Sequence, residues 1–161
     1  MRIAVMVEGK TERTFMPFLR KFLELRLGGN MPKLSTLRYD GRIPKEEKLR
    51  RIVETLLADR RNPADAVIAL TDVYTGTRDF IDAADAKSKM RTWVGNNAAF
   101  HPHAAQHDFE AWLLPYWNDI RAAVGGTRNS PGANPENVNH HNPPSKRLGE
   151  LYRTGAKGKY Y

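Results

Sequence analysis

The stretch that decides the fold is Arg2-Ile-Ala-Val-Met-Val7, followed at once by Glu8-Gly9-Lys10-Thr11-Glu12. Its apolar run is short, rich in β-branched residues and closed by a charge, which is typical of a strand buried on both faces of a parallel sheet. Gly9 permits a tight turn into a helix. Because open α/β folds bind ligands at the carboxyl ends of strands, we expect Glu8 at the functional edge of the sheet. Glu12 is expected to face the same crevice from the first helical turn.

A second buried strand is predicted from Asp65 to Thr71, and it too is followed by a carboxylate, Asp72. Strands and amphipathic helices alternate along the chain, which predicts an α/β fold with a largely parallel sheet and helices on both faces. If the first and third strands are neighbours, Glu8 and Asp72 lie at the same edge. The predicted strands are 2–7, 33–39, 65–71 and 99–106, and the predicted helices are 11–27, 44–61, 79–94, 109–114 and 145–153.

Two further structural expectations concern packing and chain organisation. Apolar residues recur at helical spacing in the first predicted helix, and we expect this stripe to pack in the core: Phe15, Phe18, Leu19, Phe22 and Leu23. The length of 161 residues suits one domain over 1–161. Within it, 127–145 is rich in Asn, Pro and Gly and is expected to form a long loop or lid, and 154–161 a flexible or truncated tail.

The charge balance favours polyanionic partners. The chain has 26 Lys and Arg against 18 Asp and Glu, for a formal net charge of +8, which suits nucleic acid, nucleotides or phosphorylated substrates. The alternative is a soluble protein with charged helix faces. The absence of cysteine excludes a disulfide framework, a thiolate zinc site and a cysteine nucleophile. Neither a signal-like segment nor a membrane-spanning run is present, so we expect a cytoplasmic protein.

Carboxylates at strand ends point to a divalent cation. The acidic set is Glu8, Glu12 and Asp72, with Asp79 and Glu110 as possible additions. Mg²⁺ takes hard oxygen ligands, usually one or two carboxylates completed by water and substrate phosphates, and such an ion could polarise a phosphodiester. The alternative is that Glu8 and Glu12 form an ordinary pair at the end of a strand and the start of a helix.

Other polar residues are candidates for proton transfer and phosphate binding. His107 precedes Glu110 by about one helical turn, so the two could act as a proton-transfer pair or simply hold the helix in place. The spacing of His101, His103 and His107 lacks a strong zinc motif, which disfavours a dedicated zinc site.

Three basic residues are candidates for contact with phosphate. Lys146 and Arg147 follow Ser145 at a predicted helix start, where an anion site is reasonable and surface solubility is the alternative. Lys10 belongs to Gly9-Lys10-Thr11, which is similar to the end of a P-loop, but the upstream glycine is missing. A nucleotide triphosphatase is therefore disfavoured, and Lys10 remains a candidate for binding phosphate.

Several motifs together resemble a known family. The segment 7–12 resembles the glutamate motif of TOPRIM domains, the metal-dependent fold of topoisomerases, primases and overcoming-lysogenization-defect nucleases. The segments 71–74, 79–80 and 106–114, then 135–139 and 144–147, are similar in order to the motifs of a TOPRIM-like bacterial family labelled as a domain of unknown function (DUF4276). The resemblance spans nearly the whole chain.

The resemblance implies roles for individual residues. Glu8 would be the general base or metal ligand of the glutamate motif, Glu12 would bind a second metal, and Asp72 would be the first aspartate of a D-x-D motif. The chain departs from that motif at the second aspartate, where Tyr74 stands. Asp79 or Glu110 could supply the missing ligand, or the site could hold one ion.

The resemblance also implies a function. It suggests a magnesium- or manganese-dependent nuclease, the effector of a bacterial anti-phage system with an ABC-type ATPase partner. The catalytic candidates are then Glu8, Asp72, His107 and Glu110. The alternative is a non-catalytic TOPRIM-like module that binds a nucleotide or a protein partner.

Overall fold

The chain divides into two compact units. The computed structural model describes residues 1–39, 41–73, 79–132, 134, 138 and 141–155. The first unit consists of Met1–Thr71 and Ala83–Ala104, and the second of Asp72–Asp82 and Ala105–Tyr161. The prediction of one domain over 1–161 stays a prediction. Most of the predicted tail and part of the predicted lid lie outside the described residues.

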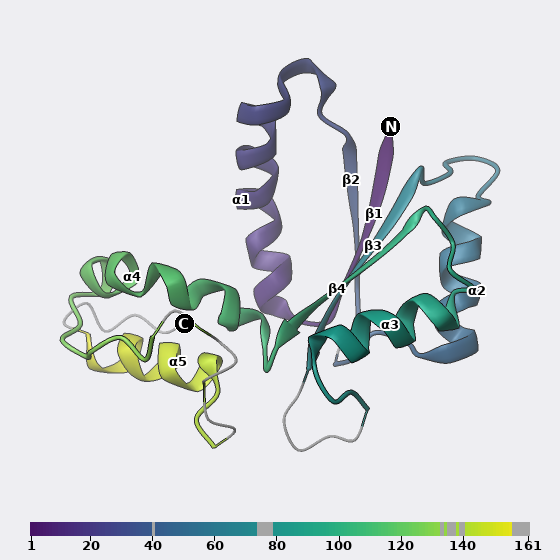
Figure 1. Ribbon diagram of the computed structural model, residues 1–161. Coiled ribbons are helices and arrows are strands. Elements are labelled where there is room, and N and C mark those ends of the chain that lie inside the picture. The colour runs from purple at the N-terminus through teal and green to yellow at the C-terminus, as the bar shows by residue number, and fades with distance from the viewer. Residues whose placement is uncertain (40, 74–78, 133, 135–137, 139–140, 156–161) are drawn as a thin grey trace. The chain divides into compact units, whose positions relative to one another are not determined.

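A four-stranded sheet organises the first unit (Figure 1). Its strands are β1 Arg2–Val7, β2 Lys33–Arg38, β3 Ala66–Val73 and β4 Phe100–Gln106, in the order β2-β1-β3-β4. β1 pairs in parallel with both β2 and β3. The predicted α/β class is therefore confirmed, and so is the expectation that the first and third strands are neighbours. The last residues of β3 and β4 belong to the second unit.

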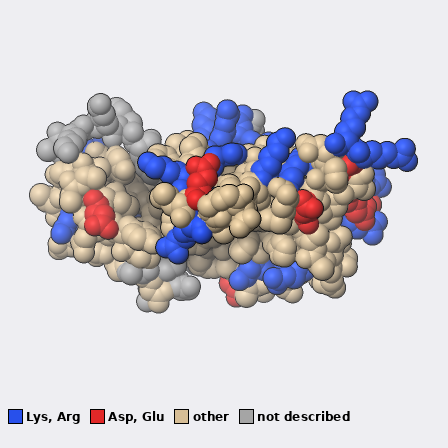
Figure 2. Space-filling view, turned by 90° about the horizontal axis from the view of Figure 1, so that it is seen from above, with Lys and Arg blue, Asp and Glu red and all other residues tan. Residues whose placement is uncertain are grey.

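Helices cover both faces of this sheet, as predicted. Helix α1 (Lys10–Leu27) lies on one face, and α2 (Glu46–Leu57) and α3 (Ala83–Trp93) lie on the other (Figure 1). The outer face of α2 carries ion pairs from Glu47 to Arg50 at 2.8 Å and to Arg51 at 2.9 Å. Figure 2 shows Lys and Arg at several separate places on the visible surface rather than in one block.

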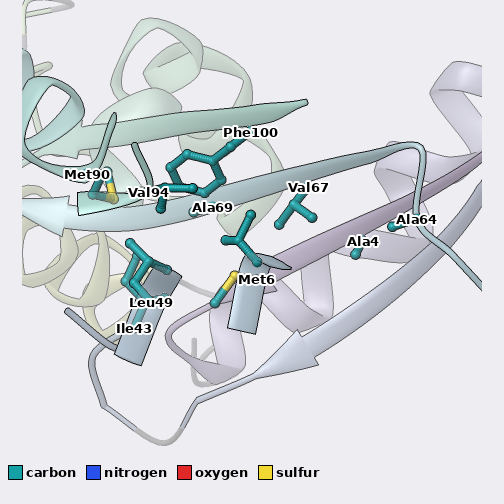
Figure 3. Close-up of a cluster of buried hydrophobic side chains, with 11 residues drawn as sticks. Ala4, Met6, Ile43, Leu49, Ala64, Val67, Ala69, Met90, Val94 and Phe100 are labelled. Carbon is teal, nitrogen blue, oxygen red and sulfur yellow. The ribbon is translucent and has the colours of Figure 1, made fainter. Parts of the chain in front are cut away.

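Alternation along β1 builds a core on each face. The side chains on the α2–α3 side form one cluster (Figure 3): Ala4, Met6, Ile43, Leu49, Val53, Ala64, Val67, Ala69, Met90, Val94 and Phe100. Those on the α1 side are Val5, Val7 and Met16, flanked by Ile3, Leu19, Leu34, Ile68 and Leu70. β1 is therefore buried on both faces, as its continuous apolar run predicts.

The predicted core stripe of α1 is wrong for Phe18 and Phe22. These rings are 66% and 50% exposed, whereas Glu12 and Met16 are buried. Met16 and Leu19 pack toward the sheet, and Phe18 faces away from it. Sequence periodicity could not separate these two apolar faces of one helix.

The start of α3 also differs from the prediction. It begins at Ala83, so Asp79 precedes the helix instead of opening it. The intervening residues, Phe80 to Asp82, are weaker helix formers than Ala83 and Ala84.

The second unit is helical in its described part. A 3₁₀ helix, η2 (Phe109–Tyr116), leads into α4 (Trp117–Val124), and α5 (Pro144–Thr154) lies beside α4 (Figure 1). Their apolar side chains form one cluster: Leu114, Trp117, Val124, Val138, Leu148 and Leu151. Val138 anchors part of the predicted lid, because it is only 5% exposed. No helix among the described residues is long and apolar enough to cross a membrane.

The buried face of α2 and the exposed face of α1 lead to a stability prediction. Replacing the fully buried Leu49 with Ala should cost about 2–5 kcal/mol, because it removes methyl groups and leaves a cavity. Phe18→Ala should change stability by less than about 0.5 kcal/mol, because the ring is mostly exposed. Urea unfolding followed by circular dichroism measures both. A loss at Phe18 as large as that at Leu49 would contradict the outward orientation of the stripe.

Candidate functional site

Glu8 is a buried carboxylate at the carboxyl end of β1. Only 1% of it is exposed. Its Oε1 accepts hydrogen bonds from Thr71 Oγ1 at 2.5 Å and from the Ile43 backbone N–H at 3.2 Å. A hydrogen bond to a charged carboxylate is stronger than one between two neutral groups. The two bonds fix the orientation of Glu8 against the end of β3 and the segment that precedes α2.

Glu12 is the second buried carboxylate of the first unit. It lies in the first turn of α1 and is 4% exposed. Its Oε2 lies so close to Gly9 that a Cβ on that residue would sit 2.9 Å away. A larger residue at position 9 would therefore displace the Glu12 carboxylate from this position, although the Gly9 φ of −128° is open to any residue. The positive end of the α1 dipole also favours a negative charge at this position.

Asp72 follows Thr71 directly in β3 and is half-buried. Alternation assigns it to the same side of the strand as Ile68 and Leu70. It belongs to the second unit, as does the half-buried Asp79. Tyr74, the residue at the second D-x-D position, lies outside the described residues.

His107 and Glu110 are both buried in the second unit, at 4% and 5% exposure. His107 follows β4 and has a φ of +73°. This left-handed conformation is uncommon outside glycine, and such strain of about 1 kcal/mol or more is concentrated at functional sites. Glu110 lies in the first turn of η2. The structure thus places both predicted residues in one short buried segment.

Asp108, between them, has a role that the sequence did not reveal. Although it precedes η2, its side chain makes no cap hydrogen bond to that helix. Its Oδ2 instead accepts hydrogen bonds from Ser145 N at 3.1 Å and Ser145 Oγ at 2.6 Å, at the start of α5. Burial raises the pKa of Asp108, and the bonds from Ser145 oppose that rise. Asp108 therefore joins the His107 segment to α5.

The remaining candidates lie at the surface or at its margin. Lys10 and Lys146 are exposed, and Arg147 is half-buried. His101 and His103 are both exposed and lie on the same face of β4. Burial lowers the pKa of His103, and the charges of Lys87, His101 and Arg91 lower it further. Both effects disfavour the charged form of this imidazole.

The first unit brings together Glu8 and Thr71, and the second brings together His107, Asp108 and Glu110. Within the described ranges, no three or more His, Asp or Glu side chains are grouped so as to hold a metal ion by themselves. The sequence missed Thr71 and Asp108. The position of Thr71 at the end of an apolar strand, directly before Asp72, is the one local signal that could have found it.

Comparison with known proteins identifies one family. A family model described as a domain of unknown function (DUF4276) matches residues 7–161. This range contains every candidate residue from Glu8 to Arg147. No curated protein and no solved structure matches the chain.

The Thr71–Glu8 contact leads to a second prediction. Thr71→Val keeps the shape of the side chain but removes the hydroxyl donor to a buried carboxylate, which should cost about 1.5–3 kcal/mol. Thr36→Val, at an exposed position of β2, is the matched control and should be nearly neutral. Thermal and urea unfolding measure both variants. Equal stability of the two would show that the hydroxyl contributes nothing to holding Glu8.

Proposed function

The chain belongs to the DUF4276 family of domains of unknown function, and we propose that it is a metal-dependent nuclease with a TOPRIM-like site. It would hydrolyse phosphodiester bonds of nucleic acid in the cytoplasm, as the effector of a bacterial anti-phage system. The observation that carries the proposal is Glu8, a carboxylate with 1% exposure at the carboxyl end of a parallel strand, oriented by two hydrogen-bond donors. Ligands in α/β folds bind at this end of the strands.

The chemistry of the donor set fits Mg²⁺ or Mn²⁺. Glu8 and Glu12 supply hard oxygen ligands, and Asp72 would add a third from the end of β3. Mg²⁺ commonly takes one or two protein carboxylates and completes its shell with water and phosphate oxygens. Asp79 is a lesser candidate for the position that Tyr74 leaves without a carboxylate. A bound ion would supply charge stabilisation at the phosphate and a more acidic water.

The other candidates would handle protons and phosphates. His107 and Glu110, both buried and three residues apart in the sequence, would move a proton to or from the water or the leaving oxygen. Lys10, Lys146 and Arg147 would contact backbone phosphates, which agrees with the net charge of +8 and with the scattered basic groups in Figure 2. Dispersed phosphate contacts position a strand without reading its sequence.

A protein partner, in this proposal an ABC-type ATPase, is supported by the outer face of α1. Phe18, Phe22 and Leu25 recur at one-turn spacing there and are 66%, 50% and 82% exposed. Arg26 lies 4.6 Å from the centre of the Phe22 ring. Contiguous exposed apolar groups of this kind mark interaction surfaces. The same face favours the alternative function, a non-catalytic module that binds a partner or a nucleotide.

Cleavage assays test the nuclease. With Mg²⁺ or Mn²⁺ and the ATPase present, Glu8→Gln, Asp72→Asn and His107→Asn should each lower cleavage of DNA or RNA by about a hundredfold or more. Gln can still accept the bonds from Thr71 and Ile43, and Asn tolerates the left-handed backbone of His107. Each variant therefore removes the chemistry while keeping the local structure. Glu47→Gln, on the exposed face of α2, is the control and should cut normally.

Two further outcomes separate the hypotheses. Unchanged cleavage by folded Glu8→Gln and Asp72→Asn proteins would overturn the nuclease, and no cleavage by the unmodified chain with its ATPase would favour the binding module. Binding of uncut nucleic acid to the Glu8→Gln protein should also fall steeply as salt rises, because phosphate contacts release counterions. A flat salt response would remove the phosphate contacts from the proposal.

The partner surface has its own test. The double variant Phe18→Ser, Phe22→Ser should no longer co-purify with a co-expressed ABC-type ATPase from the same locus, because two exposed apolar anchors are lost. Ile81→Ser is the matched control, since Ile81 is 84% exposed but lies away from α1 in the sequence. Equal retention of the ATPase by both variants would assign the α1 face another role.

A further inference from the structure

A cavity in the second unit has the composition of a ligand site. It is partly open to solvent and has a volume of about 160 Å³ between the start of α4, the segment 128–131 and the first turns of α5. A single water needs roughly 10–15 Å³ of such space, so the cavity can hold much more than one water. Its lining includes two arginines, a glutamate, an asparagine and a tryptophan: Arg128, Arg147, Glu150, Asn142 and Trp117.

The two guanidinium groups are held in place by the protein. Arg147 Nε donates to the Asn142 backbone oxygen at 2.8 Å, and among the described residues nothing bonds its two terminal amino groups. Arg128 Nη1 pairs with Glu150 Oε2 at 3.1 Å. Two arginines against one glutamate leave an excess of one positive charge in the lining. A fixed planar guanidinium suits the paired oxygens of a phosphate or carboxylate.

The other lining residues can contact parts of a ligand beyond its anionic group. Asn142 Oδ1 is shielded from solvent and accepts no hydrogen bond from a described residue. Such unsatisfied groups cost stability and call for a functional explanation. Rotation of the amide would present one hydrogen-bonding atom to a ligand. Trp117, whose Nε1 donates to the Arg128 backbone oxygen at 3.2 Å, adds a rigid apolar wall.

We infer that this cavity binds the phosphomonoester of a nucleotide. The phosphate, with a charge between about −1.5 and −2 at neutral pH, would lie against Arg147 and Arg128. A sugar hydroxyl or base amino group would bond to the Asn142 amide, and the apolar face of the sugar or base would contact Trp117. A simple anion would leave the amide and the tryptophan unused, and an apolar ligand would leave the guanidinium groups unused.

The ligand could be a free nucleoside monophosphate or the phosphorylated end of a strand, and both share this chemistry. The site requires no cleavage by the chain, so it stands even if the nuclease proposal fails. Glu8 and Asp72 take no part in it.

Isothermal titration calorimetry of the full chain tests the inference. We expect the four ribonucleoside 5′-monophosphates to bind about ten- to a hundredfold more tightly than the matching nucleosides, because only they engage the guanidinium groups. Arg147→Gln should lose a similar factor, whereas Arg153→Gln, exposed further along α5, should bind normally. Glu150→Gln should bind more tightly, because Arg128 is then no longer neutralised. A change that merely loosened the fold would weaken binding instead.

Further titrations distinguish a free nucleotide from a strand end and define the results that would overturn the inference. Short oligonucleotides with and without a 5′-phosphate are titrated in parallel: tighter binding of the phosphorylated strand assigns a strand end, and tight binding of the monophosphates alone assigns a free nucleotide. Equal affinity for nucleosides and their monophosphates, or inorganic phosphate binding as tightly as the nucleotides, would overturn the inference. So would unchanged nucleotide affinity in a folded Arg147→Gln protein.

Discussion

The hydrogen bonds of Glu8 are the constraint on which the edge of the sheet depends. An ionised carboxylate with 1% exposure is costly unless donors compensate it. Thr71 Oγ1 and the Ile43 N–H provide that compensation, and they come from the end of β3 and from the segment before α2. One side chain thus joins the ends of two parallel strands to the loop beside them. An oriented carboxylate is also what a metal ligand requires, so the same contacts would serve the proposed metal site.

The sequence predicted the parts of the fold that depend on local pattern. Continuous apolar runs identified β1 and β3 as buried strands, and alternation with helices identified the parallel sheet. It failed for the faces of α1, because Met16 and Phe18 offer two overlapping apolar stripes on one helix. The stripe that packs depends on how the whole helix lies on the sheet and on the side chains that the sheet presents to it. Neither is encoded in the spacing of the apolar residues.

The residues of the candidate site also fall into those that local sequence pattern identifies and those that it does not. Glu8 and Glu12 could be found from the sequence because each has a fixed position relative to a strand end or a helix start. Asp108 could not be assigned correctly, because its partner, Ser145, is 37 residues away and contact at that distance has no local signature. The left-handed backbone of His107 was equally hidden, since histidine has no strong preference for it. Long-range polar contacts therefore set the details that sequence patterns leave open.

The division into two units separates the candidate residues into two sets. Glu8 and Glu12 belong to the first unit, while Asp72, His107 and Glu110 belong to the second. The chain passes between the units at Thr71–Asp72, Asp82–Ala83 and Ala104–Ala105, within or beside the motifs that carry the candidate chemistry. A nuclease built from both sets would need them in register, and catalytic geometry tolerates little displacement. Within each unit, the positioning that the structure shows comes from long-range polar contacts, from Thr71 to Glu8 in the first and from Ser145 to Asp108 in the second.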